Sequence, residues 1–128
     1  MYQINIEDTF DAAHFLANYD GPCNNMQGHT WKVKVAWEAH SLDDRDMVCD
    51  FKILKLALGF LVAQLDHKVI NEELGVKQPT AEYIAKWFYD NLKTKTFKST
   101  RHDALTLVTV TIIETPGNEV TYWSCNGS

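Results

Sequence analysis

The stretch QGHTWKVKVAWE, residues 27–38, carries the clearest structural pattern in the chain. Its residues alternate in character, and Lys32 and Lys34 point away from the side that holds the apolar residues. This alternation predicts a β-strand with one buried face. That face consists of Gln27, His29, Trp31, Val33, Val35 and Trp37. The polar pair Gln27 and His29 therefore begins the inward face of the strand, not the solvated one.

Three further segments have strand character. YQINIEDTF, residues 2–10, alternates ahead of the first stretch, and its apolar side includes Ile4 and Ile6. Residues 104–114 and 119–125 form a predicted hairpin across TPGN, in which Pro-Gly favours a type II turn. The four segments together predict an antiparallel sheet.

Two segments between these strands have helical spacing. Asp50 can cap a helix that ends near Leu65, and Thr80 can cap a second helix. Ile53, Leu56 and Phe60 indicate that the first helix is buried on more than one side. The apolar stripes are Phe51, Leu54, Leu58, Leu61 and Leu65 in the first helix and Ile84, Trp87, Phe88 and Leu92 in the second.

The order ββααββ predicts one α+β domain over residues 1–128, with an antiparallel four-stranded sheet and two helices on one of its faces. Such a sheet has open edges, which oligomerisation could close into a barrel.

Composition narrows the classes of partner. Apolar residues make up 45% of the 128 residues and charged residues 23%, which is typical of a globular domain. The net charge of −5 argues against nucleic-acid binding. The stretch ILKLALGFLVAQL is interrupted by Lys55 and too short to cross a bilayer, and we see no signal peptide. Three cysteines without a CxxC pair suit a reduced protein, which we expect to be cytoplasmic.

Two histidines are candidates for a metal site. His14 follows the first predicted strand and His29 opens the second, so pairing of the two strands could bring both imidazoles to one end of the sheet. Two histidines, a third donor and an open position are the plan of a catalytic zinc site. The third donor by position is Gln27, whose neutral amide oxygen binds zinc less strongly than imidazole. For a histidine pair alone, buried histidines satisfied by the core are the commoner interpretation.

Three residues are candidates for proton transfer. Cys23 lies in a polar loop, where a thiol could act as base or nucleophile or be inert. Asp66 and His67 are adjacent at the predicted end of the first helix, and their side chains need not touch. His67 could carry a proton with Asp66 orienting it, or it could simply stabilise the helix end.

Glu114 ends a strongly apolar strand before the Pro-Gly turn. Its carboxylate is either solvated or held for a ligand. A heterocycle that presents two parallel N–H donors can be accepted by one carboxylate in bidentate fashion.

Taken together, these motifs resemble the 6-pyruvoyl-tetrahydropterin synthase superfamily in order and spacing over nearly the whole chain. The matching motifs are FDAAH, QGHTW with its preceding cysteine, MVCDF, LDH, PTAE and the late strand that ends in glutamate. The most similar branch is that of 6-carboxy-5,6,7,8-tetrahydropterin synthase in queuosine biosynthesis. That branch has a cysteine four residues before a His-Gly-His motif, as Cys23 is four before Gln27.

The resemblance implies a tunnelling fold (T-fold) whose sheets join into a barrel in a trimer, with two trimers stacked into a homohexamer and active sites between subunits. It implies Zn²⁺ held by three histidines. His14 and His29 match two of them, and Gln27 stands where the family has the third.

The resemblance also implies the remaining roles. Cys23 and the Asp66–His67 pair would move protons, Glu114 would anchor the 2-amino and N3 positions of a pterin, and Thr80 would contact the pterin. The implied substrate is 7,8-dihydroneopterin triphosphate, and the products are 6-carboxytetrahydropterin, acetaldehyde and triphosphate.

Two alternatives stay open from the sequence. One is a 6-pyruvoyl-tetrahydropterin synthase, which eliminates triphosphate without cleaving the side chain. The other is a metal-poor paralogue that binds a pterin without turnover, for which Gln27 is the only direct support.

Overall fold

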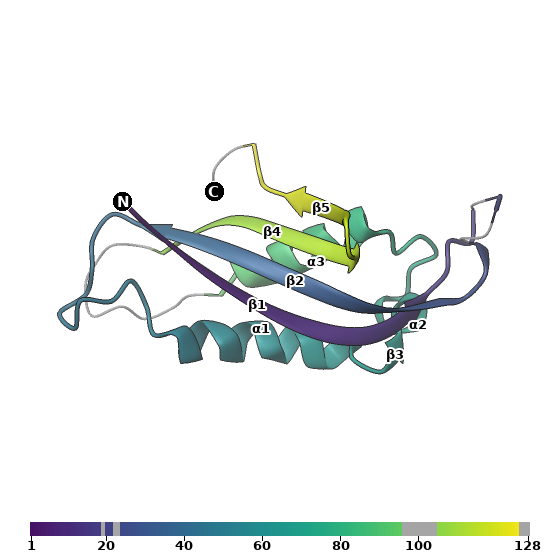
Figure 1. Ribbon diagram of the computed structural model, residues 1–128, viewed down its shortest axis with the longest axis horizontal. Coiled ribbons are helices and arrows are strands. Elements are labelled where there is room, and N and C mark those ends of the chain that lie inside the picture. The colour runs from purple at the N-terminus through teal and green to yellow at the C-terminus, as the bar shows by residue number, and fades with distance from the viewer. Residues whose placement is uncertain (19, 22–23, 96–104, 126–128) are drawn as a thin grey trace.

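The computed structural model describes residues 1–18, 20–21, 24–95 and 105–125. Figure 1 shows an α+β architecture in which a long, twisted sheet lies against two helices. The elements are β1 (Tyr2–His14), β2 (Gln27–Ala39), α1 (Phe51–Leu65), β3 (Lys68–Val69), α2 (Ile70–Leu74), α3 (Ala81–Lys93), β4 (Thr106–Thr115) and β5 (Asn118–Tyr122).

The four predicted strands form the antiparallel part of the sheet, whose full order is β3-β1-β2-β4-β5. The predicted hairpin joins β4 to β5, and Gly117 at its turn has φ +89°, as a type II turn requires. The prediction of four strands was one short, because the two-residue β3 pairs parallel with β1 at Ala12 and Ala13. The short helix α2 was also missed.

The register of β1 and β2 places the predicted inward residues on one face. His14 lies opposite Gln27, and Phe10 lies opposite Trp31. Residues paired in this way share a face of the sheet. Phe10 and Trp31 are almost fully buried against the helices and stack with ring centroids 6.0 Å apart. Burying a side chain of this size contributes about 1.5–3 kcal/mol, so the core strongly specifies the register.

The two main helices begin at their predicted caps and cover the same face of the sheet. The Asp50 carboxylate accepts a hydrogen bond from the Lys52 N–H at 2.9 Å, and the Thr80 hydroxyl accepts one from the Tyr83 N–H at 3.1 Å. Each cap contributes on the order of 1 kcal/mol. Helix α1 packs against β1, and α3 packs against β4 and β5 (Figure 1). No helix within the described residues is long and apolar enough to cross a membrane.

The prediction that α1 is buried on more than one side is wrong for this chain. Ile53, Leu56 and Phe60 are 40%, 75% and 65% exposed, because among the described residues the buried side of α1 is a single stripe. That stripe consists of Leu54, Leu58, Leu61, Val62 and Leu65.

Candidate metal centre and active site

The two predicted histidines meet at the end of the β1–β2 pair. Their ring centroids are 5.4 Å apart, on the helix-facing side of the sheet. Trp31 touches both rings edge-on, with centroids 4.9 Å from His14 and 5.5 Å from His29. The Trp31 indole N–H donates to the Ala12 carbonyl at 3.1 Å, which fixes the indole in place. The predicted convergence of the two imidazoles is therefore confirmed.

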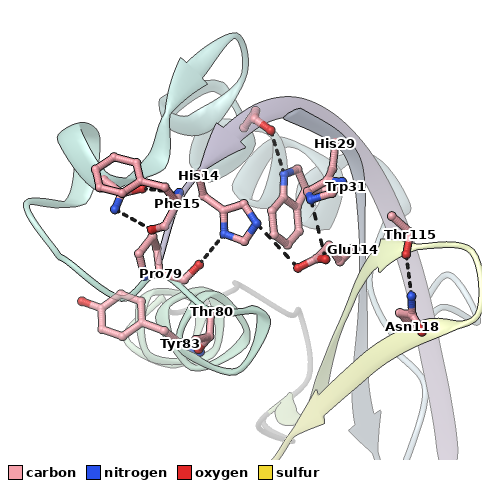
Figure 2. A network of polar contacts seen from close by, with 12 residues as sticks. His14, Phe15, His29, Trp31, Pro79, Thr80, Tyr83, Glu114, Thr115 and Asn118 are labelled. Atoms are coloured by element: carbon pink, nitrogen blue, oxygen red, sulfur yellow. Dashed lines mark hydrogen bonds and ion pairs between the residues drawn. The ribbon is translucent and has the colours of Figure 1, made fainter. Parts of the chain in front are cut away.

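A backbone carbonyl orients His14. Its Nδ1 lies 2.9 Å from the Pro79 oxygen, just before the cap of α3 (Figure 2). A carbonyl can only accept, so Nδ1 carries the hydrogen and Nε2 of the neutral ring has a free lone pair. Metal-binding histidines are commonly oriented in this way by a carbonyl or carboxylate.

The Glu114 carboxylate lies between the two Nε2 atoms, as Figure 2 shows. Its Oε2 is 3.7 Å from Nε2 of His14, and its Oε1 is 3.6 Å from Nε2 of His29. Both separations are too long for good hydrogen bonds. Within the part of the chain that the structure describes, Nε2 of His29 is buried and has no hydrogen-bond partner. We call His14, His29 and Glu114 the inner cluster.

The inner cluster fits a zinc ion. One ligand atom from each of its three side chains lies within 4.8 Å of the others. Imidazole nitrogen and carboxylate oxygen are both regular zinc donors, and two donors on one tetrahedral zinc are about 3.3 Å apart. The observed separations of 3.6 and 3.7 Å are close to that spacing. The histidines and the carboxylate thus form a pocket of donors that can close on one cation.

Two other predicted site residues, Gln27 and Thr80, are placed by their relation to His14 and its partner Pro79. Gln27 is opposite His14 in the strand register, so it shares the same face, and its role as a metal ligand stays a prediction. Thr80 follows Pro79 and caps α3. Its hydroxyl accepts from the Tyr83 N–H, and an accepting hydroxyl can still donate its own hydrogen.

The side chains of Asp66 and His67 contact each other directly, which the sequence had left open. Nδ1 of His67 lies 3.1 Å from Oδ2 of Asp66. His67 has a φ of +60°, a conformation that non-glycine residues rarely adopt. Its N–H donates to the Asp11 carbonyl at 2.6 Å, which holds this turn against the edge of β1.

Asp11 joins this pair and was missed by sequence reasoning. Its backbone N–H donates to Oδ1 of Asp66 at 2.9 Å, and its own carboxylate accepts from the Thr30 hydroxyl at 2.6 Å. The Asp11 N–H, and to a lesser degree His67, hold the pKa of Asp66 below its ordinary value, against a smaller opposing effect of burial. Asp11 and Thr30 are paired in the β1–β2 register, a signal that strand pairing could have provided. We call Asp11, Asp66 and His67 the outer cluster.

The two clusters face different sides of the sheet. Asp11 alternates with the buried Phe10 and Ala12, so its side chain points away from the helices, whereas the inner cluster points toward them. The clusters are still neighbours, because His29 and His67 both line an open depression of about 510 Å³. Cys23, the third proton-transfer candidate, lies outside the described residues.

Comparison with known proteins identifies the family. Residues 3–125 match the family described as 6-pyruvoyl tetrahydropterin synthase. The 6-carboxy-5,6,7,8-tetrahydropterin synthase of Synechocystis sp. is 37% identical over 98 residues, which cover 73% of this chain and 76% of that protein. The protein of the same name from Bacillus subtilis is 29% identical over 128 residues, with 94% and 84% covered.

Solved structures agree with these sequence relatives. The structure of Caenorhabditis elegans 6-pyruvoyl tetrahydropterin synthase superposes with a TM-score of 0.81 at 27% identity and covers 96% of this chain and 95% of that one. The predicted T-fold and the resemblance on which it depended are thus confirmed. The chain belongs to the 6-pyruvoyl tetrahydropterin synthase family of pterin-synthesising enzymes.

Proposed function

We propose that the chain is a zinc-dependent 6-carboxy-5,6,7,8-tetrahydropterin synthase. It would convert 7,8-dihydroneopterin triphosphate to 6-carboxy-5,6,7,8-tetrahydropterin, acetaldehyde and triphosphate in queuosine biosynthesis. The observation that carries the proposal is the inner cluster, in which two oriented imidazoles and a carboxylate meet at one end of the sheet. The names of the Synechocystis and Bacillus relatives support the choice of reaction.

His14 and His29 would hold the zinc ion through their Nε2 atoms. When bound, zinc supplies Lewis-acid polarisation of the substrate's side-chain oxygens, which makes the neighbouring C–H protons more acidic. The Pro79 carbonyl keeps the His14 lone pair directed at the ion. Trp31 restricts rotation of both rings, since it contacts each of them edge-on.

Glu114 and Thr80 would bind the pterin ring. A carboxylate accepts two parallel N–H bonds, which matches the 2-amino and N3 edge of a pterin. Glu114 is 30% exposed on its side chain, so a ligand can reach it from solvent. Thr80 follows Pro79, whose carbonyl contacts the His14 ring, so its hydroxyl would contribute a further contact to the pterin (Figure 2).

Asp66 and His67 would carry protons, together with Cys23. Asp66 stays ionised because its pKa is lowered, so it can orient the His67 ring through Nδ1 and leave Nε2 to exchange protons. The His67 side chain is 77% exposed, which suits a group that passes protons to a substrate or to water. A positioned acid or base of this kind contributes about 10²–10⁴-fold in rate.

We further propose that the chain works in the cytoplasm as a homohexamer, without nucleic-acid or membrane partners. The part of β1 that precedes its short pairing with β3, and the outer edge of β5, would be the strands that a trimeric barrel pairs. Because the inner and outer clusters face opposite sides of one sheet, a site shared between subunits would combine the inner cluster of one chain with the outer cluster of its neighbour.

Mixed assemblies test this arrangement. His29→Ala and His67→Ala are each expected to be inactive alone. If sites are shared, co-assembly of the two variants restores a fraction of wild-type turnover, because some sites then combine two intact clusters. Absence of any recovery, with mixed assemblies demonstrated by mass spectrometry, would show that each chain builds its whole site.

Product analysis tests the reaction. Purified protein with zinc is incubated with 7,8-dihydroneopterin triphosphate, and pterins and acetaldehyde are measured by mass spectrometry. Formation of 6-carboxytetrahydropterin with acetaldehyde is the expected result. A 6-pyruvoyl product without acetaldehyde would favour the second candidate, to which the Caenorhabditis elegans relatives lend support. Pterin binding without product would indicate the metal-poor paralogue.

A further inference from the structure

We infer that Glu114 is the third protein ligand of the metal, taking the position in the ligand set that the family pattern would give to residue 27. The inner cluster would then be a site of two histidines and one carboxylate. The inference deepens the proposed function and rests on it for the identity of the ion, but metal binding to the chain requires neither substrate nor turnover.

The position of the carboxylate carries the inference. Each oxygen of Glu114 lies near a different imidazole, at 3.7 Å from His14 and 3.6 Å from His29. These separations exceed a hydrogen bond but match two donors that share one small cation. The carboxylate therefore already stands where a third ligand would stand.

The histidines present unused donor atoms toward the carboxylate. Among the residues that the structure describes, His29 is the one with a buried side-chain nitrogen that lacks any hydrogen-bond partner, and that atom is Nε2. His14 is 6% exposed on its side chain, and its Nε2 is the ring nitrogen that does not contact the Pro79 carbonyl. A cation between them would satisfy both lone pairs and the carboxylate at once.

Ligand chemistry favours the carboxylate over the amide of Gln27. Zinc sites are built from thiolate, imidazole and carboxylate, and two histidines with one glutamate are an established catalytic set. An anionic oxygen neutralises part of the ion's charge in a buried site, which a neutral amide oxygen does not. The chain thus has a way to hold zinc without a third histidine.

Strand pairing explains how Glu114 comes close to the two histidines of the inner cluster, which are distant from it in the sequence. Strand β4 pairs with β2 so that Ile112 lies opposite Val33, and both are buried on the helix-facing side. Glu114 is two residues beyond Ile112 and so projects to the same side, next to Trp31 and the histidines. A carboxylate has about four acceptor sites, so ligating a metal still leaves acceptors for the N–H groups of a pterin.

Zinc affinity of variants without substrate tests the inference. The metal-free chain is titrated with Zn²⁺ against a chromophoric chelator, and folding is checked by circular dichroism. Glu114→Gln is expected to weaken zinc binding by at least ~100-fold. Loss of a residue that only hydrogen-bonds to a metal ligand lowers metal affinity by about 100-fold at most. Glu119→Gln is the matched control, because Glu119 is exposed on the adjoining strand β5, and its zinc affinity should stay within about threefold of wild type.

A second variant and a spectrum keep the result interpretable. Glu114→Asp retains the charge and a donor oxygen, so it should recover part of the affinity that Glu114→Gln loses. Co²⁺ in place of zinc should show a different visible absorption spectrum in wild type and in Glu114→Gln, because a coordinating oxygen is exchanged.

The outcomes separate cleanly. Weak zinc binding in Glu114→Gln supports the inference. A weaker affinity in Gln27→Ala as well would show that Gln27 is an additional donor, and it would not contradict the role of Glu114. Wild-type zinc affinity and an unchanged Co²⁺ spectrum in Glu114→Gln would overturn it. A chain that binds zinc through Glu114 but makes no 6-carboxytetrahydropterin would refute the proposed reaction and leave this inference standing.

Discussion

The inner and outer clusters share strand β1, which contributes His14 to the first and Asp11 to the second, yet the two clusters lie in different environments. His14 of the inner cluster is 6% exposed on its side chain, whereas His67 of the outer cluster is 77% exposed. Strand alternation sends His14 toward the helices and Asp11 toward the open side, and the turn after α1 places His67 on that open side next to Asp66. The same end of the sheet thus has one buried face, which holds His14, and one face exposed to solvent, which holds Asp11.

The difference in burial matches a difference in chemistry. A buried nitrogen without a hydrogen-bond partner costs free energy unless a bound group satisfies it, and a cation held by the inner cluster would do so. An exposed imidazole that is oriented by a carboxylate is in contact with solvent and can be reached by a substrate, which suits proton transfer. The comparison predicts that damage to the inner cluster removes the metal and that damage to the outer cluster leaves the metal in place.

The largest effect is expected for His29→Ala. This variant removes one of the two imidazoles proposed to hold zinc in the inner cluster. Zinc content per chain should therefore fall below about 0.1 equivalent, and turnover should fall by on the order of 10³-fold or more. Metal analysis and a turnover assay on the same sample measure both. His40→Ala, just past the end of β2 and exposed, is the control and should bind zinc like wild type. Full zinc content in His29→Ala would remove His29 from the metal site.

A smaller effect, with a different signature, is expected for His67→Ala. Turnover should drop by about 10²–10⁴-fold because a proton carrier is lost, while zinc content stays at the wild-type level. Addition of imidazole to the assay should restore some activity, as it can replace the missing ring. Loss of zinc together with activity would mean that the outer cluster supports the inner one, and the two clusters would no longer be separable.

The convergence of the histidines could be predicted from sequence because it depends on local patterns. Alternation in residues 27–38 and the position of His14 at the end of the preceding strand suffice for a hairpin-like pairing. The caps Asp50 and Thr80 were likewise predicted, since a capping side chain acts on backbone groups only two or three residues away.

The approach of Glu114 to the histidines could not be predicted, because it depends on the register of β2 and β4. Strands β2 and β4 are far apart in the sequence, and neither strand alone specifies that Val33 pairs with Ile112. The register shifts between Ala36 and Trp37 and between Ile113 and Thr115 are further irregularities that no local pattern specifies. The contact between Asp66 and His67 was also not predicted, and it occurs at a residue with a positive φ of +60° that the sequence does not indicate.

Gln27→His sharpens the account of the inner cluster. A third imidazole should tighten zinc binding by about tenfold and raise turnover, since imidazole is a better zinc donor than an amide. If Glu114 is needed as a ligand only because residue 27 is not a histidine, Glu114→Gln should lower the zinc affinity much less in the Gln27→His variant than in wild type. Chelator competition on the four proteins gives this interaction directly. Equal losses in both backgrounds would mean that Glu114 and residue 27 act independently.

The smallest expected effect is on the stability of the fold, to which Asp66 of the outer cluster makes a contribution that depends on pH. The pKa of Asp66 is lowered mainly by the Asp11 N–H, so ionised Asp66 stabilises the fold above the ordinary aspartate value of about 3.9. That contribution is lost as pH falls through the lower pKa of the folded state. Asp66→Asn should therefore unfold at lower urea concentration than wild type at pH 6, and the gap should close as pH drops below 3.9. A gap that is constant with pH would show that the Asp66 charge contributes nothing and that the side chain acts only by shape and hydrogen bonding.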